Sequence, residues 1–327
     1  MHCPRQPSTL SSTTIFTHQR NHPTIKKGDI KHRNEEEDVR KKDMAHVKDS
    51  PPAFPPFALL IPTTTTTTTT TPSPILILLL PTPLAALSTP YIDLYRSLHA
   101  DAAFCRMGFG AGFPARSWAR AECADVVRAR DVLPGWMGEG GDLEMGDFAV
   151  GLVRSDDLAA RLLSGDDAPA GRRSVGKDGG IQILEGDAFR RVFGDNITTT
   201  TTTSASSQDG EGDEPFKGVE WVGYAGVRDA KRSMPPRSPS DAPLPPPREL
   251  VELRYGVAPS SWGRGIAPRA AEAVMAWAAA ERGVTRFVAE TEADNERSGR
   301  VLGRMGFRVC ATDYWKDEGQ LEWERVV

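Results

Sequence analysis

APSSWGRGIA, at residues 258–267, is the stretch that decides the fold expected for this chain. Before it, ELVELRYGV at residues 249–257 alternates in the way typical of a β-strand. After it, small apolar residues recur at helical spacing up to about Glu281. The sequence therefore predicts a strand, a glycine-containing turn and a helix, in that order.

Such a turn has a definite chemistry. The first backbone N–H groups of a helix have no partner within the helix, and the positive end of the helix dipole lies at the same point. Gly263 and Gly265 have no Cβ, so an anion can approach the backbone closely. The arrangement is suited to a phosphate or pyrophosphate. Neither the dinucleotide-binding motif nor the P-loop fits, because a third spaced glycine and a Gly-Lys-Ser/Thr sequence are both missing.

A second segment follows the same plan. TRFVAET at residues 285–291 is predicted to be a strand, and ADNERSGRVLGRMGF at residues 293–307 a helix. Asn295 or Asp294 is a suitable N-cap, and Gly306 is a suitable helix terminator.

Together the two segments resemble the GCN5-related N-acetyltransferase (GNAT) superfamily, particularly the branch of the ribosomal-protein N-terminal acetyltransferases. The matching text is A-P-x-x-W-G-x-G-I-A followed by D-N-x-x-S-x-R-V-L-x-x-x-G-F, over about residues 249–310. The resemblance implies an α+β fold, with a mixed, mostly antiparallel sheet flanked by helices. It also implies that two neighbouring strands splay apart and hold acetyl-CoA, the cosubstrate, between them.

The resemblance also implies roles for individual residues. The backbone of the turn would hold the pyrophosphate, Asn295 would bond the pantetheine arm, Ser298 would lie near the thioester sulfur, and Glu252 would act as a base through water. The expected cofactor-binding residues are Val257, Trp262, Gly263, Arg264, Gly265, Ile266, Ala267, Asn295 and Arg300, and the expected catalytic residues are Glu252 and Ser298.

Each role has a simpler structural alternative. Glu252 is also compatible with an ordinary strand glutamate, Ser298 with a serine bonded to its own helix, and Asn295 with a plain N-cap. The sequence departs from the family pattern at Ser260, where Gln or Arg is usual, and at Leu302, where many relatives have a tyrosine that acts as general acid. A third departure is Arg269, at a position that is often glutamate.

Acetyl transfer to an amine needs a neutral nucleophile and a polarised thioester carbonyl, and holding two substrates in line supplies much of the acceleration. We therefore expect an N-acetyltransferase in which an amine attacks acetyl-CoA directly in a ternary complex. The alternative is a non-catalytic CoA-binding module with an interaction or sensing role. Protein α-amino groups, lysine side chains, polyamines and other small amines all suit the chemistry as acceptors.

Composition narrows the partners and the chemistry. The 327 residues include 40 Lys plus Arg and 44 Asp plus Glu, a net charge of −4, so the whole chain offers no electrostatic case for nucleic acid or an anionic membrane. The four cysteines form no C-x-x-C pair, and five of the six histidines lie in the first fifty residues. We expect no metal site, no disulfide framework, and a cytoplasmic or nuclear location.

The domain organisation follows from changes in composition. Residues 1–72 are predicted to be a disordered N-terminal extension, because they contain a mixed-charge block, a Pro-rich stretch and nine consecutive threonines. Residues 73–327 are predicted to form the acetyltransferase domain. A polar insertion is expected at about 154–217 and a Pro-rich loop at about 229–248. The apolar run at residues 75–80 is too short to cross a membrane and is expected to be a buried strand.

Overall fold

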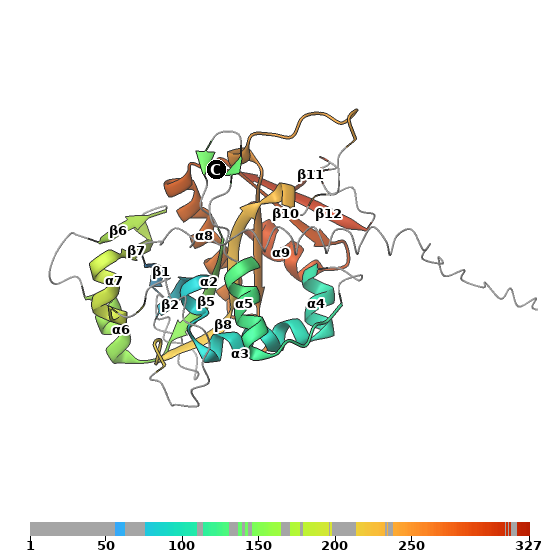
Figure 1. Cartoon of the computed structure of the whole chain (residues 1–327). Coiled ribbons are helices and arrows are strands. Elements are labelled where there is room, and N and C mark those ends of the chain that lie inside the picture. Colours follow the sequence, from blue (N-terminus) through green and yellow to red (C-terminus); the bar gives the residue numbers. More distant parts are fainter. Residues whose placement is uncertain are drawn as a thin grey trace, which may run out of the picture. The chain divides into compact units, whose positions relative to one another are not determined.

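A computed structural model describes residues 56–62, 76–109, 114–130, 137–138, 141–142, 146–164, 171–176, 179–195, 197, 214–232, 234, 238–310, 312, 314 and 319–327. These residues form one long sheet with helices on both of its faces (Figure 1). The expected α+β fold, a mixed and mostly antiparallel sheet flanked by helices, is confirmed.

The strands of the main sheet follow the order β11-β12-β10-β9-β8-β5-β2-β1-β7-β6. Their bounds are β1 (Phe57–Pro62), β2 (Leu76–Pro81), β5 (Asp147–Val153), β6 (Arg172–Val175), β7 (Ile181–Glu185), β8 (Val219–Asp229), β9 (Val251–Val257), β10 (Arg286–Glu292), β11 (Arg308–Cys310) and β12 (Gln320–Val326). A separate two-stranded hairpin joins β3 (Met137–Gly138) to β4 (Gly141–Asp142). Neighbours in the main sheet pair antiparallel, except for β9 and β10, which are parallel.

Two groups of helices cover the sheet. The helices are α2 (Thr82–Ala85), α3 (Thr89–Ala100), α4 (Ala102–Phe109), α5 (Arg120–Arg130), α6 (Asp156–Leu163), α7 (Gly186–Phe193), α8 (Ile266–Arg282) and α9 (Glu296–Arg304). Side chains of α8 and α9 pack on one face, and those of α2 to α7 pack on the other. Successive residues of β2 point to opposite faces, so Leu78 joins one core and Ile77 the other. Burial on both faces explains why β2 is continuously apolar rather than alternating.

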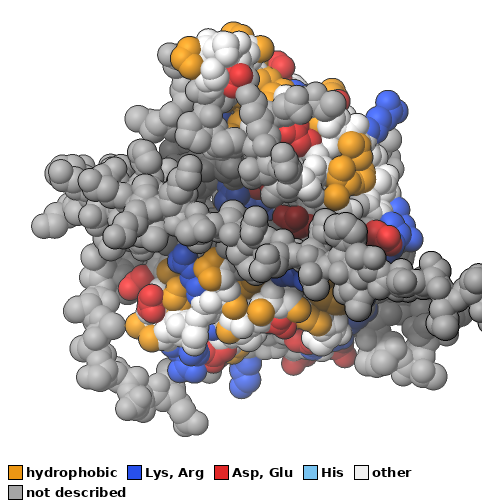
Figure 2. All heavy atoms as spheres, turned by 90° about the vertical axis from the view of Figure 1, so that its right-hand side faces the viewer, with side chains coloured by type: hydrophobic (Ala, Val, Ile, Leu, Met, Phe, Trp, Pro, Cys, Tyr) orange, Lys and Arg blue, Asp and Glu red, His pale blue; other side chains and the backbone are white. Residues whose placement is uncertain are grey.

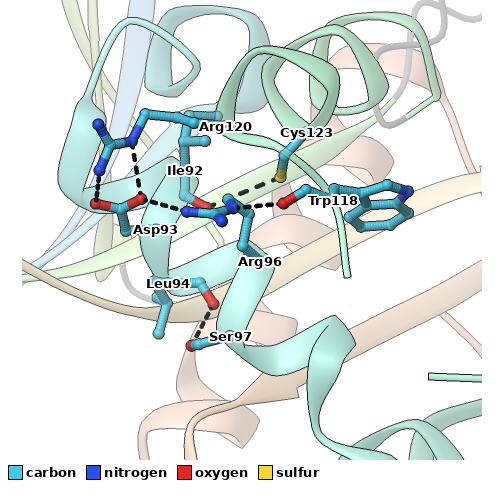
Figure 3. A network of polar contacts seen from close by, with 8 residues as sticks. All are labelled: Ile92, Asp93, Leu94, Arg96, Ser97, Trp118, Arg120 and Cys123. Carbon is cyan, nitrogen blue, oxygen red and sulfur yellow. Dashed lines mark hydrogen bonds and ion pairs between the residues drawn. The ribbon is translucent and has the colours of Figure 1, made fainter. Parts of the chain in front are cut away.

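Helix α3 begins at a side-chain cap. The Ser88 side chain accepts a hydrogen bond from the backbone N–H of Tyr91, and Pro90 lies in the first turn. Polar contacts then fasten α5 to α3 (Figure 3): Asp93 accepts hydrogen bonds from Arg120 at 3.0 and 2.9 Å and from Arg96 at 3.1 Å. The bonds from Arg120, more than those from Arg96, hold the pKa of the Asp93 carboxyl below its usual range.

The sheet extends further along the chain than we predicted. Residues 57–62, assigned to the disordered extension, form β1, which pairs with both β2 and β7. FALLIP is a short apolar run between prolines, and prolines at strand ends do not interrupt a ladder. The other residues of the predicted extension lie outside the described residues.

The described residues of the predicted polar insertion at about 154–217 form regular helices and strands. Its described residues contain α6, β6, β7 and α7, so this segment supplies one end of the sheet. Its polarity reflects an edge position, since Arg173 and Ser174 of β6 are exposed. The described residues of the Pro-rich segment at about 229–248 begin with the last residue of β8, Asp229, and include short 3-10 turns at Ala230–Arg232 and Pro247–Glu249.

Strands β9 and β10 touch only where they begin. Their parallel register joins Val251 with Phe287 and Glu252 with Val288 and extends no further. Beyond that point β9 stays paired with β8, and β10 stays paired with β12. The two strands therefore diverge toward their carboxyl ends, which confirms the expected splayed pair.

No helix among the described residues is long and apolar enough to cross a membrane.

Candidate active site

The divergence of β9 and β10 brings two helix N-termini to one end of an opening in the sheet. Strand β9 leads through a short turn into α8, and β10 leads into α9. Helix α4 lies next to the start of α9, where Arg106 forms an ion pair with Asp294 at 3.5 Å (Figure 1). The site is thus built from β9, the turn after it, and the first turns of α8 and α9.

The turn at residues 262–265 leaves its backbone open. Gly263 has a φ of +75° and Gly265 a φ of +69°, the left-handed region that favours glycine. A Cβ built at either position would meet no atom within 4 Å. Gly265 is the N-cap of α8 and no side chain of the described residues caps the helix there, so the first N–H groups of α8 have no partner within their own helix. These features fit an anionic group at the helix N-terminus.

Trp262 ties the turn to both sides of the opening. Its indole Nε1 donates to the backbone oxygen of Val257, at the end of β9, at 2.6 Å. The guanidinium of Arg297, on α9, lies 4.7 Å from the centre of the Trp262 ring. Because the N–H of Ala258 donates to Val222 on β8, strand alternation directs the backbone groups of Val257 toward the opening.

Tyr255 and Ser298 meet across the opening. The phenol oxygen of Tyr255, on β9, lies 2.6 Å from Ser298 Oγ, in the first turn of α9. Burial raises the pKa of Tyr255 to about 12, while the hydrogen bond to Ser298 opposes that shift. The phenol therefore remains protonated at neutral pH.

Asn295 is the N-cap of α9. Its Oδ1 accepts from the backbone N–H of Ser298 at 3.1 Å, which confirms the expected cap. Its Nδ2 donates to the backbone oxygen of Met107, on α4, at 2.8 Å. Both polar atoms of the side chain thus hold α9 and α4 together beside the opening.

Glu252 lies away from these groups. It occupies the closed end of the strand pair, opposite Val288, and is 7% exposed. Arg228 binds it at two points, Nε to Oε2 at 2.7 Å and Nη2 to Oε1 at 3.0 Å. Strand alternation places Glu252 on the opposite face of the sheet from Tyr255. The structure therefore does not bring Glu252 and Ser298 together.

The same face as Glu252 carries a second ion pair. Arg254 Nη1 donates to Asp147 Oδ2 at 3.0 Å, and their side chains are only 15% and 3% exposed. Burial raises the pKa of Asp147, and the guanidiniums of Arg254 and Arg228 oppose that rise. Gly226 makes room for this carboxylate, since a Cβ there would lie 2.1 Å from Asp147 Oδ1.

The remaining predicted residues lie in the turn, at the start of α8 and on α9. Arg264 is exposed in the turn, Ile266 is buried at the start of α8, and Ala267 is partly buried beside it. Arg300 is exposed on α9 and pairs with Glu296 at 3.0 Å, a surface contact worth a few tenths of a kcal/mol, about 0.3–0.5.

The structure places the turn at Trp262 against α9, whose first turn carries Asn295 and Ser298, and adds Tyr255 to these residues. Sequence reasoning missed Tyr255. The signal was present in ELVELRYGV, where alternation places Tyr255 on the same strand face as Leu253 and Val257.

No group of three or more His, Cys, Asp and Glu residues that could hold a metal ion is found in the described ranges. On the face in Figure 2, the described Lys and Arg side chains are interspersed with Asp, Glu and apolar ones.

Comparison with known families identifies this same region. Residues 206–308 match the model of the acetyltransferase (GNAT) domain. The matched segment, about a third of the chain, contains β8, β9, the turn, α8, β10 and α9, which form the opening and its mouth. A comparison with curated protein sequences finds no match.

Solved structures are similar at a greater distance. A GNAT-family acetyltransferase from Bacillus anthracis shares 12% identity with a TM-score of 0.37, over 76% of this chain and 94% of that one. An acetyltransferase from Agrobacterium tumefaciens str. C58 shares 16% identity with a TM-score of 0.37, over 86% and 98% of the two chains. A ribosomal-protein-alanine N-acetyltransferase from Brucella melitensis shares 22% identity with a TM-score of 0.25, over 37% and 66%.

Proposed function

We propose that this chain is an N-acetyltransferase that transfers the acetyl group of acetyl-CoA to an amine acceptor by direct attack in a ternary complex. The observation that carries the proposal is the splayed pair β9 and β10, with an open glycine turn at the start of α8, inside the segment that matches the acetyltransferase (GNAT) domain.

The turn supports a phosphate-bearing cosubstrate. Trp262, Gly263, Arg264, Gly265, Ile266 and Ala267 form the proposed pyrophosphate site, with Arg300 nearby on α9. The anion would accept hydrogen bonds from the uncapped N–H groups of α8, and the helix dipole would favour its charge. Within the turn, the positive φ values at Gly263 and Gly265 expose the backbone without a Cβ in the way.

The opening itself supports an extended ligand. Beyond Glu252, the backbone groups of β9 that face away from β8 pair with no strand among the described residues. Buried backbone groups require hydrogen-bond partners, and a pantetheine arm carries two amides that suit them. Val257 is proposed to contribute to this contact, and Asn295 to fix the helix beside it.

For the chemistry, Ser298 is proposed to support the departing sulfur and Glu252 to receive the proton of the amine through water. Since Arg228 binds both oxygens of Glu252, this role requires that one oxygen exchange Arg228 for the bridging water. The variant Glu252→Gln tests the role, with kcat expected to fall most at low pH. An unchanged pH–rate profile would remove Glu252 from the mechanism.

The double contact between Arg228 and Glu252 is also the observation that favours a second candidate, a CoA-binding module without catalysis. The two functions differ in turnover. Purified protein is mixed with acetyl-CoA and a panel of amines that includes an alanine-terminal peptide, a lysine peptide and a polyamine, and thiol release is followed. An acetyltransferase releases thiol with at least one acceptor. A binding module shows heat on titration with coenzyme A but no thiol release. If the protein gives neither heat nor thiol release, both candidates are refuted.

The proposed partners are acetyl-CoA and an amine acceptor, and the proposed reaction requires no metal, nucleic acid or membrane. The proposed location is cytoplasmic or nuclear.

A further inference from the structure

Two hydroxyl groups meet beside the place where β9 and β10 have separated. Tyr255 lies three residues beyond Glu252, the last β9 residue in register with β10, so its ring stands where the strands have separated. The Tyr255 side chain extends from β9 toward α9, and its hydroxyl oxygen lies 2.6 Å from Ser298 Oγ. The contact links the two elements that border the opening.

The geometry favours one direction for this hydrogen bond. Hydroxyl–hydroxyl bonds are usually 2.5–3.0 Å long. If Ser298 were the donor, the phenol hydrogen would turn to the next acceptor within reach, the backbone oxygen of Ser298 at 3.4 Å, which is a poor distance. A phenol is also a stronger acid than an aliphatic alcohol, and therefore the better donor of the two. The Tyr255 hydroxyl thus donates to Ser298 Oγ, and the serine hydrogen is left for a third atom.

We propose that Tyr255 is a positioning residue for acetyl transfer, which turns the Ser298 O–H into the opening so that it donates to the departing thiolate. This inference rests on the proposed function, because it needs a thioester in that opening.

The step balances without any further reactant. The nitrogen lone pair of the neutral amine attacks the thioester carbonyl carbon, the C–N bond forms, and the C–S bond breaks with its electron pair going to sulfur. The surplus proton on nitrogen passes through water to Glu252, the proposed base. Negative charge therefore grows on sulfur in the transition state, and a preoriented O–H donor stabilises it there more than in the ground state.

The ionisation behaviour of Tyr255 agrees with a donor that keeps its proton. Burial raises the pKa of Tyr255 to about 12, well above the value of about 8.5 typical of a thiol. The phenol proton consequently stays on oxygen, and Tyr255 acts by orienting and polarising Ser298 rather than by protonating sulfur.

The test is a double-mutant cycle on the full chain with Tyr255→Phe, Ser298→Ala and the double variant. Thiol release gives kcat and KM, calorimetry gives coenzyme A affinity, and thermal unfolding reports folding. Each single variant is expected to lower kcat by about 10-fold to 100-fold, as for the loss of a hydrogen bond to a charged group. The double variant is expected to lose no more than the worse single one, because the two hydroxyls act as a unit. Coenzyme A affinity is expected to stay within about threefold of wild type.

Tyr91→Phe is the matched control, since it removes a phenol oxygen from a side chain buried in the other core, against Trp221. Its kcat is expected to equal that of wild type. The inference is overturned if Tyr255→Phe keeps full kcat, if the two single losses multiply in the double variant, or if Tyr91→Phe loses as much. A wild-type protein that releases no thiol overturns the proposed function, and this inference with it, so the two failures are distinguishable.

Discussion

Removal of the Arg254 guanidinium should lower the free energy of unfolding, because the buried Asp147 carboxylate loses its partner. Arg254 Nη1 lies 3.0 Å from Asp147 Oδ2, and the Asp147 side chain is 3% exposed. The variant Arg254→Met retains most of the apolar stem but removes the cation. Loss of one partner from a buried pair costs about 3–5 kcal/mol, because the remaining charge is left in a poorly solvated place.

The cost should depend on pH in a defined direction. Burial already raises the pKa of Asp147, and Arg254 is the strongest opposing influence, so the variant raises it further. A carboxyl whose pKa is higher in the folded state favours folding below its unfolded pKa of about 3.9, and that contribution is lost as pH rises through the folded pKa. The loss of unfolding free energy caused by Arg254→Met should therefore be close to its full value at pH 8 and much smaller near pH 4.

The measurement is thermal unfolding of wild type and Arg254→Met at both pH values. With about 2–4 °C of Tm per kcal/mol for a domain of this size, the expected loss at pH 8 is about 6–20 °C. Asp147→Asn combined with Arg254→Met should recover part of it. Arg325→Met is the control, since its pair with Glu272 is 26% and 43% exposed and is worth at most about 1 kcal/mol. A loss that is independent of pH, or no larger than that of Arg325→Met, would refute the reasoning.

Three further predictions concern the turn and the opening. Gly265→Ala should cost roughly 1–2 kcal/mol of unfolding free energy through its positive φ alone, whereas Gly303→Ala within α9 should stabilise by about 0.5–1 kcal/mol. Denaturant titration measures the unfolding free energy of both variants. A change of the same sign in Gly265→Ala and Gly303→Ala would contradict the argument. Trp262→Phe keeps a ring but loses the bond to Val257, so it should cost about 0.5–1.5 kcal/mol in the same assay, and an unchanged stability would show the bond to be without effect. Tyr255 should ionise near pH 12, and the phenolate absorbance of wild type minus that of Tyr255→Phe measures this ionisation. The protonated phenol favours the folded state. This contribution to the free energy of unfolding should be complete below pH 10 and lost as pH rises from 10 to 12. A difference signal that titrates near pH 10 would contradict the burial of the phenol.

Local patterns in the sequence predicted the elements that carry the site. The strand predicted at residues 249–257 contains β9, the strand predicted at residues 285–291 overlaps β10, and the cap predicted at Asn295 opens α9. These features depend on side-chain alternation and on a cap four residues long, both of which are complete within a short window.

Features that depend on register were not readable in the same way. Arg228 faces Glu252 because β8 and β9 pair in one register, across 24 residues of sequence. Tyr255 meets Ser298 across 43 residues. A shift of one residue in the register of β9 would move Glu252 and Tyr255 to the opposite faces of the sheet, and no local pattern encodes that choice. Strand β1 escaped prediction for a related reason, because FALLIP becomes a strand only through its partners β2 and β7.

The missing strand pairing at the opening costs stability, and the side chains that border the opening offset part of that cost. Parallel strands that diverge leave backbone N–H and C=O groups without a ladder partner, and buried groups of that kind are destabilising unless another partner is found. Trp262 supplies one partner, at Val257, and the contacts of Arg297 with Trp262 and of Ser298 with Tyr255 hold α9 against the other side. Two of these contacts, Arg297 with Trp262 and Ser298 with Tyr255, therefore span the place where strand pairing is absent. A fold under selection for stability alone would close this gap with further β9–β10 hydrogen bonds. Its maintenance by side chains, beside an uncapped helix N-terminus, is the physical reason to regard it as a binding site.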